Sequence, residues 1–308
     1  EQPPPVRGQK DFNMSNWTIP TARLLLAGLL AVGLAACGAK TARTGAAATL
    51  IGEGWTKYRL SEFQDAQLAF EAARAGAEKG SDEWAMATYG LATTWDLRRP
   101  GEDPKKATGL YQEIVAAAPA SPMMPWTELA LARQKHLVPV GQDPDYDAVN
   151  AAYRHILDRY PGHLAAKEAF LYLQSILLAK LDPKSTREAE RKLREFVADG
   201  SQEFAGPAWS LLAVAYNMLG EPEKRLEAEE KSFELTEVDP ADPFVEFAWA
   251  YWNLATIAEF EVGDFALARH YYNLLLEKYP KDIRVYGCKQ ALARMDALEA
   301  KIRAEEGI

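Results

Sequence analysis

The chain has 308 residues, of which 48% are hydrophobic and 26% are charged, as is typical of a folded protein and not of a disordered chain. Its 44 Asp and Glu residues outnumber its 35 Lys and Arg residues, for a formal charge of −9 at pH 7. Nucleic-acid binding needs a clustered basic surface, so this balance argues against a nucleic-acid partner. Two cysteines, Cys37 and Cys288, are too few for the disulfide framework of a small secreted domain.

The first predicted element is an apolar run over residues 24–34. It follows Arg23, and no charged residue occurs before Cys37. A membrane-spanning helix needs about 20 apolar residues, so the run is too short to span and instead matches the core of a signal peptide. The sequence therefore predicts a signal peptide over residues 1–36, with residues 1–13 interpreted as lying upstream of a natural start at Met14.

The apolar run ends on the residues Leu34-Ala35-Ala36-Cys37, which Gly38 follows. This segment resembles the lipobox of bacterial lipoproteins. The resemblance implies that the Cys37 thiol receives a diacylglycerol, that the peptide is cleaved before it, and that the new N-terminus is acylated. Several acyl chains together anchor a soluble domain stably. The alternatives are an ordinary cleaved signal peptide with an incidental cysteine, or a short buried helix.

The residue after the cysteine bears on the cellular address. Gly38 stands where an aspartate would, in enteric-type bacteria, indicate retention in the inner membrane. By that family rule, the resemblance implies a lipid-anchored protein on the periplasmic face of the outer membrane. Residues 37–46 are mostly small and polar, and we predict that they form a short tether between the lipid and the fold.

A repeated pattern follows, and its clearest copy lies near the C-terminus. Phe265 after Gly-Asp, a small Ala268, an aromatic Tyr272 and a closing Pro280 resemble the second helix of a tetratricopeptide repeat. The same frame recurs along the chain in four further copies: Phe63, Ala66, Phe70 and Ala73; Ala107, Tyr111, Ile114 and Pro119; Tyr146, Val149, Tyr153 and Ile156; and, more weakly, Ala189, Leu193 and Phe196.

The first helices of the repeats are also visible. Trp209, Leu212, Ala213 and Tyr216 have the spacing of the opening pattern of the same repeat, and shorter matches begin at Trp126 and Tyr251. Apolar residues at steps of three and four line one face of a helix. No unit can bury that face alone, so the units are expected to stack.

The resulting prediction is an all-α, TPR-like solenoid over residues 47–281, closed by a C-terminal capping helix within 282–308. Arg225 stands where the frame expects a small residue, so we expect the fifth hairpin to depart most from the pattern. The six predicted hairpins cover residues 47–80, 82–120, 122–162, 163–201, 206–240 and 243–281.

The sequence holds little that resembles a reactive site. None of the four histidines has the compact spacing of a metal site, and Cys288 has no cysteine or histidine beside it. We interpret Cys288 as a packing residue. The chain has no nucleophile elbow, no phosphate-binding loop and no complete dinucleotide fingerprint. We therefore predict no catalytic residues, no metal and no cofactor, and hence a protein that is not an enzyme.

The sequence instead indicates a surface for binding other molecules. Stacked hairpins curve, and their first helices line a groove suited to peptides or partner helices. The aromatic-rich segment 244–260 contains Trp249 and Trp252, which lie on a neighbouring face if Tyr251 is the packing aromatic. These two tryptophans are candidate partner-binding residues. The alternative is that they pack against the preceding unit or the capping helix, and Trp84 and Trp95 carry the same ambiguity.

Together these patterns predict a lipid-anchored scaffold in the bacterial envelope, attached to the membrane through Cys37. Its expected partners are other envelope proteins or peptides, within an outer-membrane, secretion or pilus-type complex. Two alternatives stay open: a regulator of peptidoglycan enzymes, and a glycan-binding accessory subunit that uses exposed tryptophans.

Overall fold

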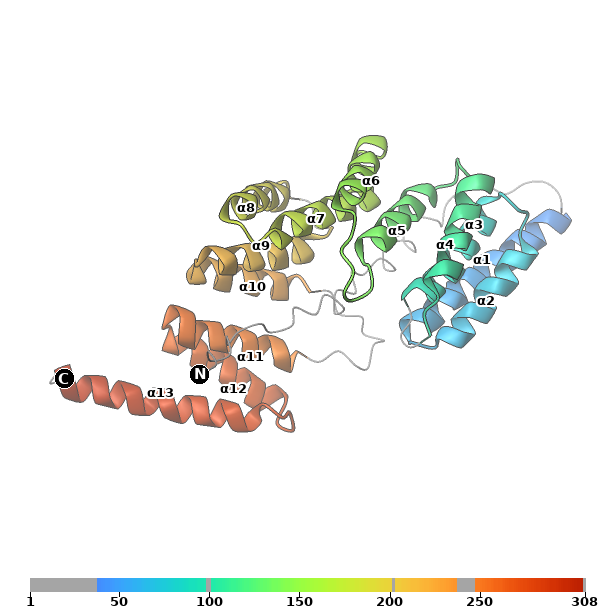
Figure 1. The fold of residues 1–308 in the computed structure, drawn as a ribbon. Helices are drawn as coiled ribbons and strands as arrows, with labels where there is room; N and C mark the ends of the chain where they lie inside the picture. The colour runs from blue at the N-terminus through green and yellow to red at the C-terminus, as the bar shows by residue number, and fades with distance from the viewer. Residues whose placement is uncertain (1–37, 98–100, 201–202, 237–246, 307–308) are drawn as a thin grey trace, which may run out of the picture.

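The computed structural model describes residues 38–97, 101–200, 203–236 and 247–306. The predicted signal peptide, the lipobox and Cys37 lie outside the described residues. Within them, six helical hairpins follow one another along the chain and a last helix ends the series (Figure 1). The described residues contain no β-strand. None of their helices is both long and apolar enough to cross a membrane.

Each hairpin pairs two consecutive α-helices, and a short π-helix extends the first helix of hairpin 6. The elements are α1 (Gly38–Arg59) and α2 (Phe63–Gly76); α3 (Asp82–Leu97) and α4 (Pro104–Ala117); α5 (Met124–His136) and α6 (Tyr146–Arg159); α7 (Leu164–Ala179) and α8 (Pro183–Ala198); α9 (Ala205–Leu219) and α10 (Pro222–Glu234); α11 (Ala248–Ile257), η2 (Ala258–Val262) and α12 (Phe265–Lys278); and finally α13 (Val285–Glu306).

The second helix of each hairpin begins at an acidic residue. In α4, α6, α8 and α12 the cap is an aspartate whose side chain accepts a hydrogen bond from a backbone N–H of the first turn, which stabilises the helix start. Proline occupies the first position of α4, α8 and α10, where its missing N–H costs no hydrogen bond. Gly220 ends α9 with a φ of 68°, a conformation that glycine adopts without strain.

Counted from that cap, the buried positions of the second helices share one frame. Position four is alanine or valine, position eight is aromatic and position eleven is aliphatic in hairpins 1, 2, 3 and 6, and these side chains are all but completely buried. Each ring packs against an aromatic side chain of a first helix. The residues are Ala66, Phe70 and Ala73; Ala107, Tyr111 and Ile114; Val149, Tyr153 and Ile156; and Ala268, Tyr272 and Leu275.

Hairpins 4 and 5 depart from this frame. Position eight is Glu190 in α8 and Glu229 in α10, so neither helix supplies an aromatic ring there. For hairpin 4 the predicted frame on Ala189, Leu193 and Phe196 was wrong by three residues, because Asp182 and not a later residue caps α8. Ala189 and Leu193 are nevertheless buried.

The predicted all-α solenoid of six hairpins with a C-terminal helix is confirmed. One boundary differs. The segment 38–46, predicted as a tether, is helical, because α1 already begins at Gly38, and Ala47 is buried. Alanine, lysine and arginine all favour a helix, so a segment of small and polar residues was a poor indication of a linker.

The buried hydrophobic residues form two clusters. The N-terminal core runs without interruption from Ile51 in α1 through hairpins 1–4 and α9 to Ala228 in α10. The C-terminal core is built from α11, η2, α12 and α13, together with Leu226 of α10. The hydrophobic interior of the described residues is therefore divided, and the division falls at α10.

Candidate functional site

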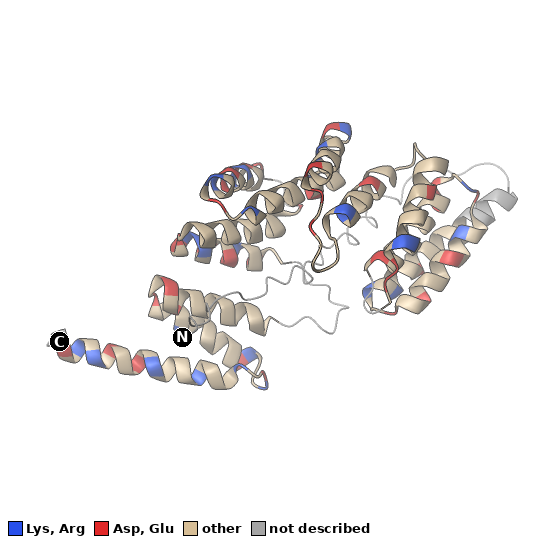
Figure 2. Cartoon of the chain, in the orientation of Figure 1, with Lys and Arg blue, Asp and Glu red and all other residues tan. Residues whose placement is uncertain are grey.

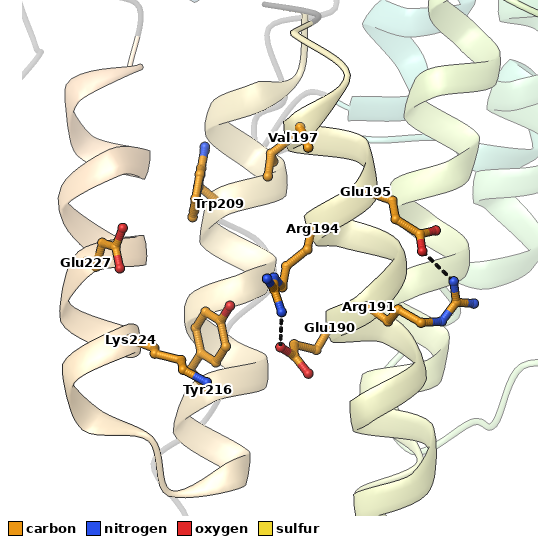
Figure 3. Close-up of a pocket in the computed structure, with 10 residues that line it drawn as sticks. Glu190, Arg191, Arg194, Glu195, Val197, Trp209, Tyr216, Lys224 and Glu227 are labelled. Atoms are coloured by element: carbon orange, nitrogen blue, oxygen red, sulfur yellow. Dashed lines mark hydrogen bonds and ion pairs between the residues drawn. The ribbon is translucent and has the colours of Figure 1, made fainter.

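An open pocket lies between α8, α9 and α10, in hairpins 4 and 5 (Figure 3). Helices α8 and α10 form its two walls and α9 its floor. Most of the lining comes from second helices, whereas the sequence predicted a binding surface on first helices. The lining residues are Glu190, Arg191, Arg194, Glu195, Val197 and Ala198 of α8, Trp209 and Tyr216 of α9, and Lys224 and Glu227 of α10.

The departure of hairpin 4 from the repeat frame explains why this space is open. In hairpin 3 the position-eight residue Tyr153 stacks on Tyr172 of the next first helix, with ring centroids 5.2 Å apart. Glu190 takes that position in α8, and its carboxylate faces Tyr216 of α9. The pKa of Tyr216 is raised mainly by burial and, to a lesser extent, by the negative charge of Glu190. A carboxylate cannot fill the volume of a phenol ring, so the pocket remains between the helices.

The basic residues of the pocket each lie beside a carboxylate of the chain. Arg191 contacts Glu195 at 2.6 Å and Lys224 contacts Glu221 at 2.8 Å. Arg194 contacts the largely buried Glu190 more loosely, at 3.6 Å. These pairs belong to a surface on which both signs of charge alternate, as Figure 2 shows along α8 and α13.

Glu227 differs from the other acids of the pocket. It is exposed on α10, and among the described residues its carboxylate has no ion-pair or hydrogen-bond partner. Across the pocket, the indole of Trp209 extends from α9 (Figure 3). The pocket thus combines a flat aromatic side chain with a carboxylate that makes no ion-pair contact among the described residues, although Lys231 of the same helix interacts with it electrostatically.

The predicted pair Trp249 and Trp252 is separated by the structure. Tyr251 is buried, as the prediction assumed. Trp252 packs edge-on against Tyr272, with ring centroids 5.5 Å apart, and lies so close to Gly287 of α13 that a Cβ there would be 2.8 Å from its ring. Trp249 is 57% exposed. Trp252 therefore holds α13 in place, while partner binding by either residue stays a prediction.

The interior of the N-terminal core holds a charged cluster that sequence reasoning missed. The buried guanidinium of Arg133 in α5 donates a 3.0 Å hydrogen bond to buried Asp96 in α3. Glu168 of α7 is completely buried near Arg133, and burial raises the pKa of its carboxyl group to about 7. These residues belong to successive first helices, and no local motif links positions so far apart in sequence.

The structure also shows where Cys288 and the histidines lie. Cys288 is completely buried in the C-terminal core, which confirms it as a packing residue, and burial raises the pKa of its thiol to about 11. His136 lies 3.2 Å from the hydroxyl of Tyr153. Nowhere in the part of the chain that the structure describes do three His, Cys, Asp or Glu side chains converge as a metal site would require.

Comparison with known proteins gives little beyond the fold. No family model matches the sequence, and no curated protein matches it. A solved structure of the assembly chaperone of RpL4 (Acl4, residues 1–338) resembles this chain with a TM-score of 0.46 and 16% sequence identity. The match covers 83% of this chain and 99% of that one. Similarity at this level does not extend to function.

Proposed function

We propose that this protein is a lipid-anchored scaffold of the bacterial envelope that binds another protein through the pocket between α8, α9 and α10. The observation that carries the binding role is the pocket itself, which is lined by Trp209 and by Glu227, a carboxylate without an ion-pair contact among the described residues. Aromatic side chains in partly enclosed sites are frequent anchors of protein interfaces. The envelope address is supported by the resemblance to a lipobox at Cys37.

Site-specific photo-crosslinking in native envelopes tests the binding role. A photoreactive amino acid replaces Ala198, which is exposed at the pocket, or, as the control, Leu68, which is 57% exposed on α2 and far from it in sequence. We expect one discrete protein adduct from position 198 and none from position 68. Equal labelling at both positions, or no protein adduct at position 198, would contradict the proposal.

The anchor is tested separately with Cys37→Ala. We expect this variant to lose the mass of the acyl chains and to appear either unanchored or as the unprocessed precursor. A variant that fractionates with membranes as before, beside a wild type without lipid, would rule out the lipoprotein assignment and leave the binding role untouched.

A glycan-binding accessory role is the second candidate, and the observation that favours it is the exposed Trp249. Aromatic faces stack on sugar rings as well as on protein side chains. Under that role, Trp249→Ala would abolish retention on immobilised peptidoglycan fragments, whereas Trp209→Ala would leave it unchanged. Under the scaffold role neither substitution alters retention on glycan.

A further inference from the structure

The tryptophans of this chain are usually covered by another ring or by a cation. Among the seven that the structure describes, five have such a partner, and only Trp209 and Trp249 have none. Trp249 is largely exposed, whereas Trp209 lines a pocket. The five covered tryptophans are Trp55, Trp84, Trp95, Trp126 and Trp252.

One of these tryptophans shows how the chain itself fills the equivalent site. Trp84, like Trp209, is followed by buried residues three, four and seven positions later in a first helix. The guanidinium of Arg74, from the preceding second helix, lies 5.4 Å from the centre of the Trp84 ring and donates to Glu113 of the following second helix. A guanidinium thus bridges an indole and a carboxylate between neighbouring hairpins.

At Trp209 the corresponding guanidinium is present in the pocket, but no cation–π contact places it over the ring. Counted from the helix caps, Arg194 corresponds to Arg74, and Lys231 corresponds to Glu113. Because lysine replaces the acid, Arg194 has no carboxylate to hold it over the ring, and it lies instead beside Glu190. The acid available on α10 is Glu227, within the pocket.

We infer that the pocket binds an arginine side chain of a partner protein, which stacks on Trp209 and pairs with Glu227. This inference rests on the proposed binding role and specifies the chemistry of the partner. Arginine fits better than lysine because its planar guanidinium stacks on an indole and presents paired donors to a carboxylate. The pocket's own cations lie against Glu190, Glu195 and Glu221, and Lys231 interacts with Glu227 electrostatically but without an ion-pair contact, so the Glu227 carboxylate can accept hydrogen bonds from an incoming guanidinium.

The probe is a blocked tripeptide, acetyl-Gly-Arg-Gly-amide, and its neutral counterpart contains citrulline in place of arginine. The full-length protein is labelled with 5-fluorotryptophan, and the Trp209 signal in the ¹⁹F spectrum is assigned with Trp209→Phe. We expect the arginine peptide to shift this signal saturably in the millimolar range and the citrulline peptide to leave it in place. Glu227→Gln should weaken binding about threefold to fivefold, as is typical of a partly exposed ion pair.

Glu223→Gln is the matched control, since Glu223 is exposed on the same helix outside the pocket, and it should bind the peptide like the wild type. An unresponsive Trp209 signal, or equal binding by Glu227→Gln and the wild type, would overturn the inference. The inference would also be overturned if the Arg194→Gln substitution shifted the Trp209 signal in the absence of peptide. That shift would show that Arg194 already covers the ring. The crosslink at position 198 is scored independently, so a protein adduct without arginine binding would refute this inference and leave the scaffold proposal standing.

Discussion

The N-terminal and C-terminal parts of this solenoid are built from the same hairpin but are joined unequally. From α1 to α9 each hairpin buries apolar side chains against the next, and the result is one core. At the step from α10 to α11 the frame positions four and eight hold Arg225 and Glu229, and the apolar interior is interrupted. Helix α8 also has a glutamate at position eight, Glu190, and still shares a core with α9, so Arg225 at position four is the residue that distinguishes the interrupted step.

The junction between the two cores has an ionic end and an aromatic end. Arg225 donates to both oxygens of Glu261 in η2, at 2.6 and 2.7 Å, and also to Asn217 of α9. At the other end Phe233 of α10 packs edge-on against Phe247 and Tyr251. A partly exposed ion pair contributes less to stability than the burial of aromatic rings, so we expect the aromatic end to contribute more to the junction.

The largest loss of stability is expected in a hairpin whose second helix has an aromatic residue at position eight. Tyr153→Ala removes a fully buried ring from the N-terminal core and should cost about 3–5 kcal/mol of unfolding free energy. Glu229→Ala, at the same frame position of α10, should change the unfolding free energy by about 1 kcal/mol or less, because burial raises the pKa of this half-buried acid and disfavours its charge. Urea unfolding followed by circular dichroism compares the two. Equal losses would contradict the proposed difference between the junctions.

The stability of the N-terminal core should depend on pH through the buried Glu168. Because Glu168 has a pKa of about 7 when folded, well above its ordinary value, the native state binds its proton more tightly than the unfolded chain does. The unfolding free energy should therefore rise by about 1 kcal/mol as the pH falls from 8 to 6, and Glu168→Gln should remove this rise. Burial lowers the pKa of His136, which acts in the opposite sense, so the difference between wild type and variant is the quantity to measure.

The smallest effect concerns the ionic end of the junction. Arg225→Ala should lower the unfolding free energy of the C-terminal core by about 0.5–1 kcal/mol, because the pair with Glu261 is partly exposed. Arg191→Ala is the control, since its pair with Glu195 is more exposed and lies within a single helix. A stability loss in the control as large as in Arg225→Ala would show that the contact between hairpins has no special role.

The sequence predicted the hairpins well because their signals are local. Acidic caps, prolines and the spacing of Ala268 and Tyr272 act within one helix, so a single chain reveals them. The departure at Arg225 was visible for the same reason. The charged cluster of Asp96, Arg133 and Glu168 was not predicted, because it forms only when three first helices stack.

The candidate site was missed for a related reason. Trp209 was recognised as part of the opening pattern of its repeat, and it does pack partly against the N-terminal core, but only the structure shows that no aromatic ring or cation among the described residues covers it. Trp252, a binding candidate in the sequence, packs against Tyr272 and Gly287, which was the alternative that the sequence left open, and partner binding by it stays a prediction. The sequence shows how many aromatic side chains a segment has, but only the structure shows which of them pack against a neighbouring side chain.

Native-state hydrogen exchange, resolved by segment with mass spectrometry, tests the division of the core most directly. Among the described residues, the C-terminal core is the smaller one and contacts the N-terminal part chiefly through α10, so α11, α12 and α13 should open together, with a lower free energy than α3 to α8. Arg225→Ala should lower the opening free energy of the C-terminal helices and leave that of α3 to α8 unchanged. A single opening free energy shared by both groups of helices, shifted equally by the substitution, would show that the solenoid has one cooperative core and would contradict this account.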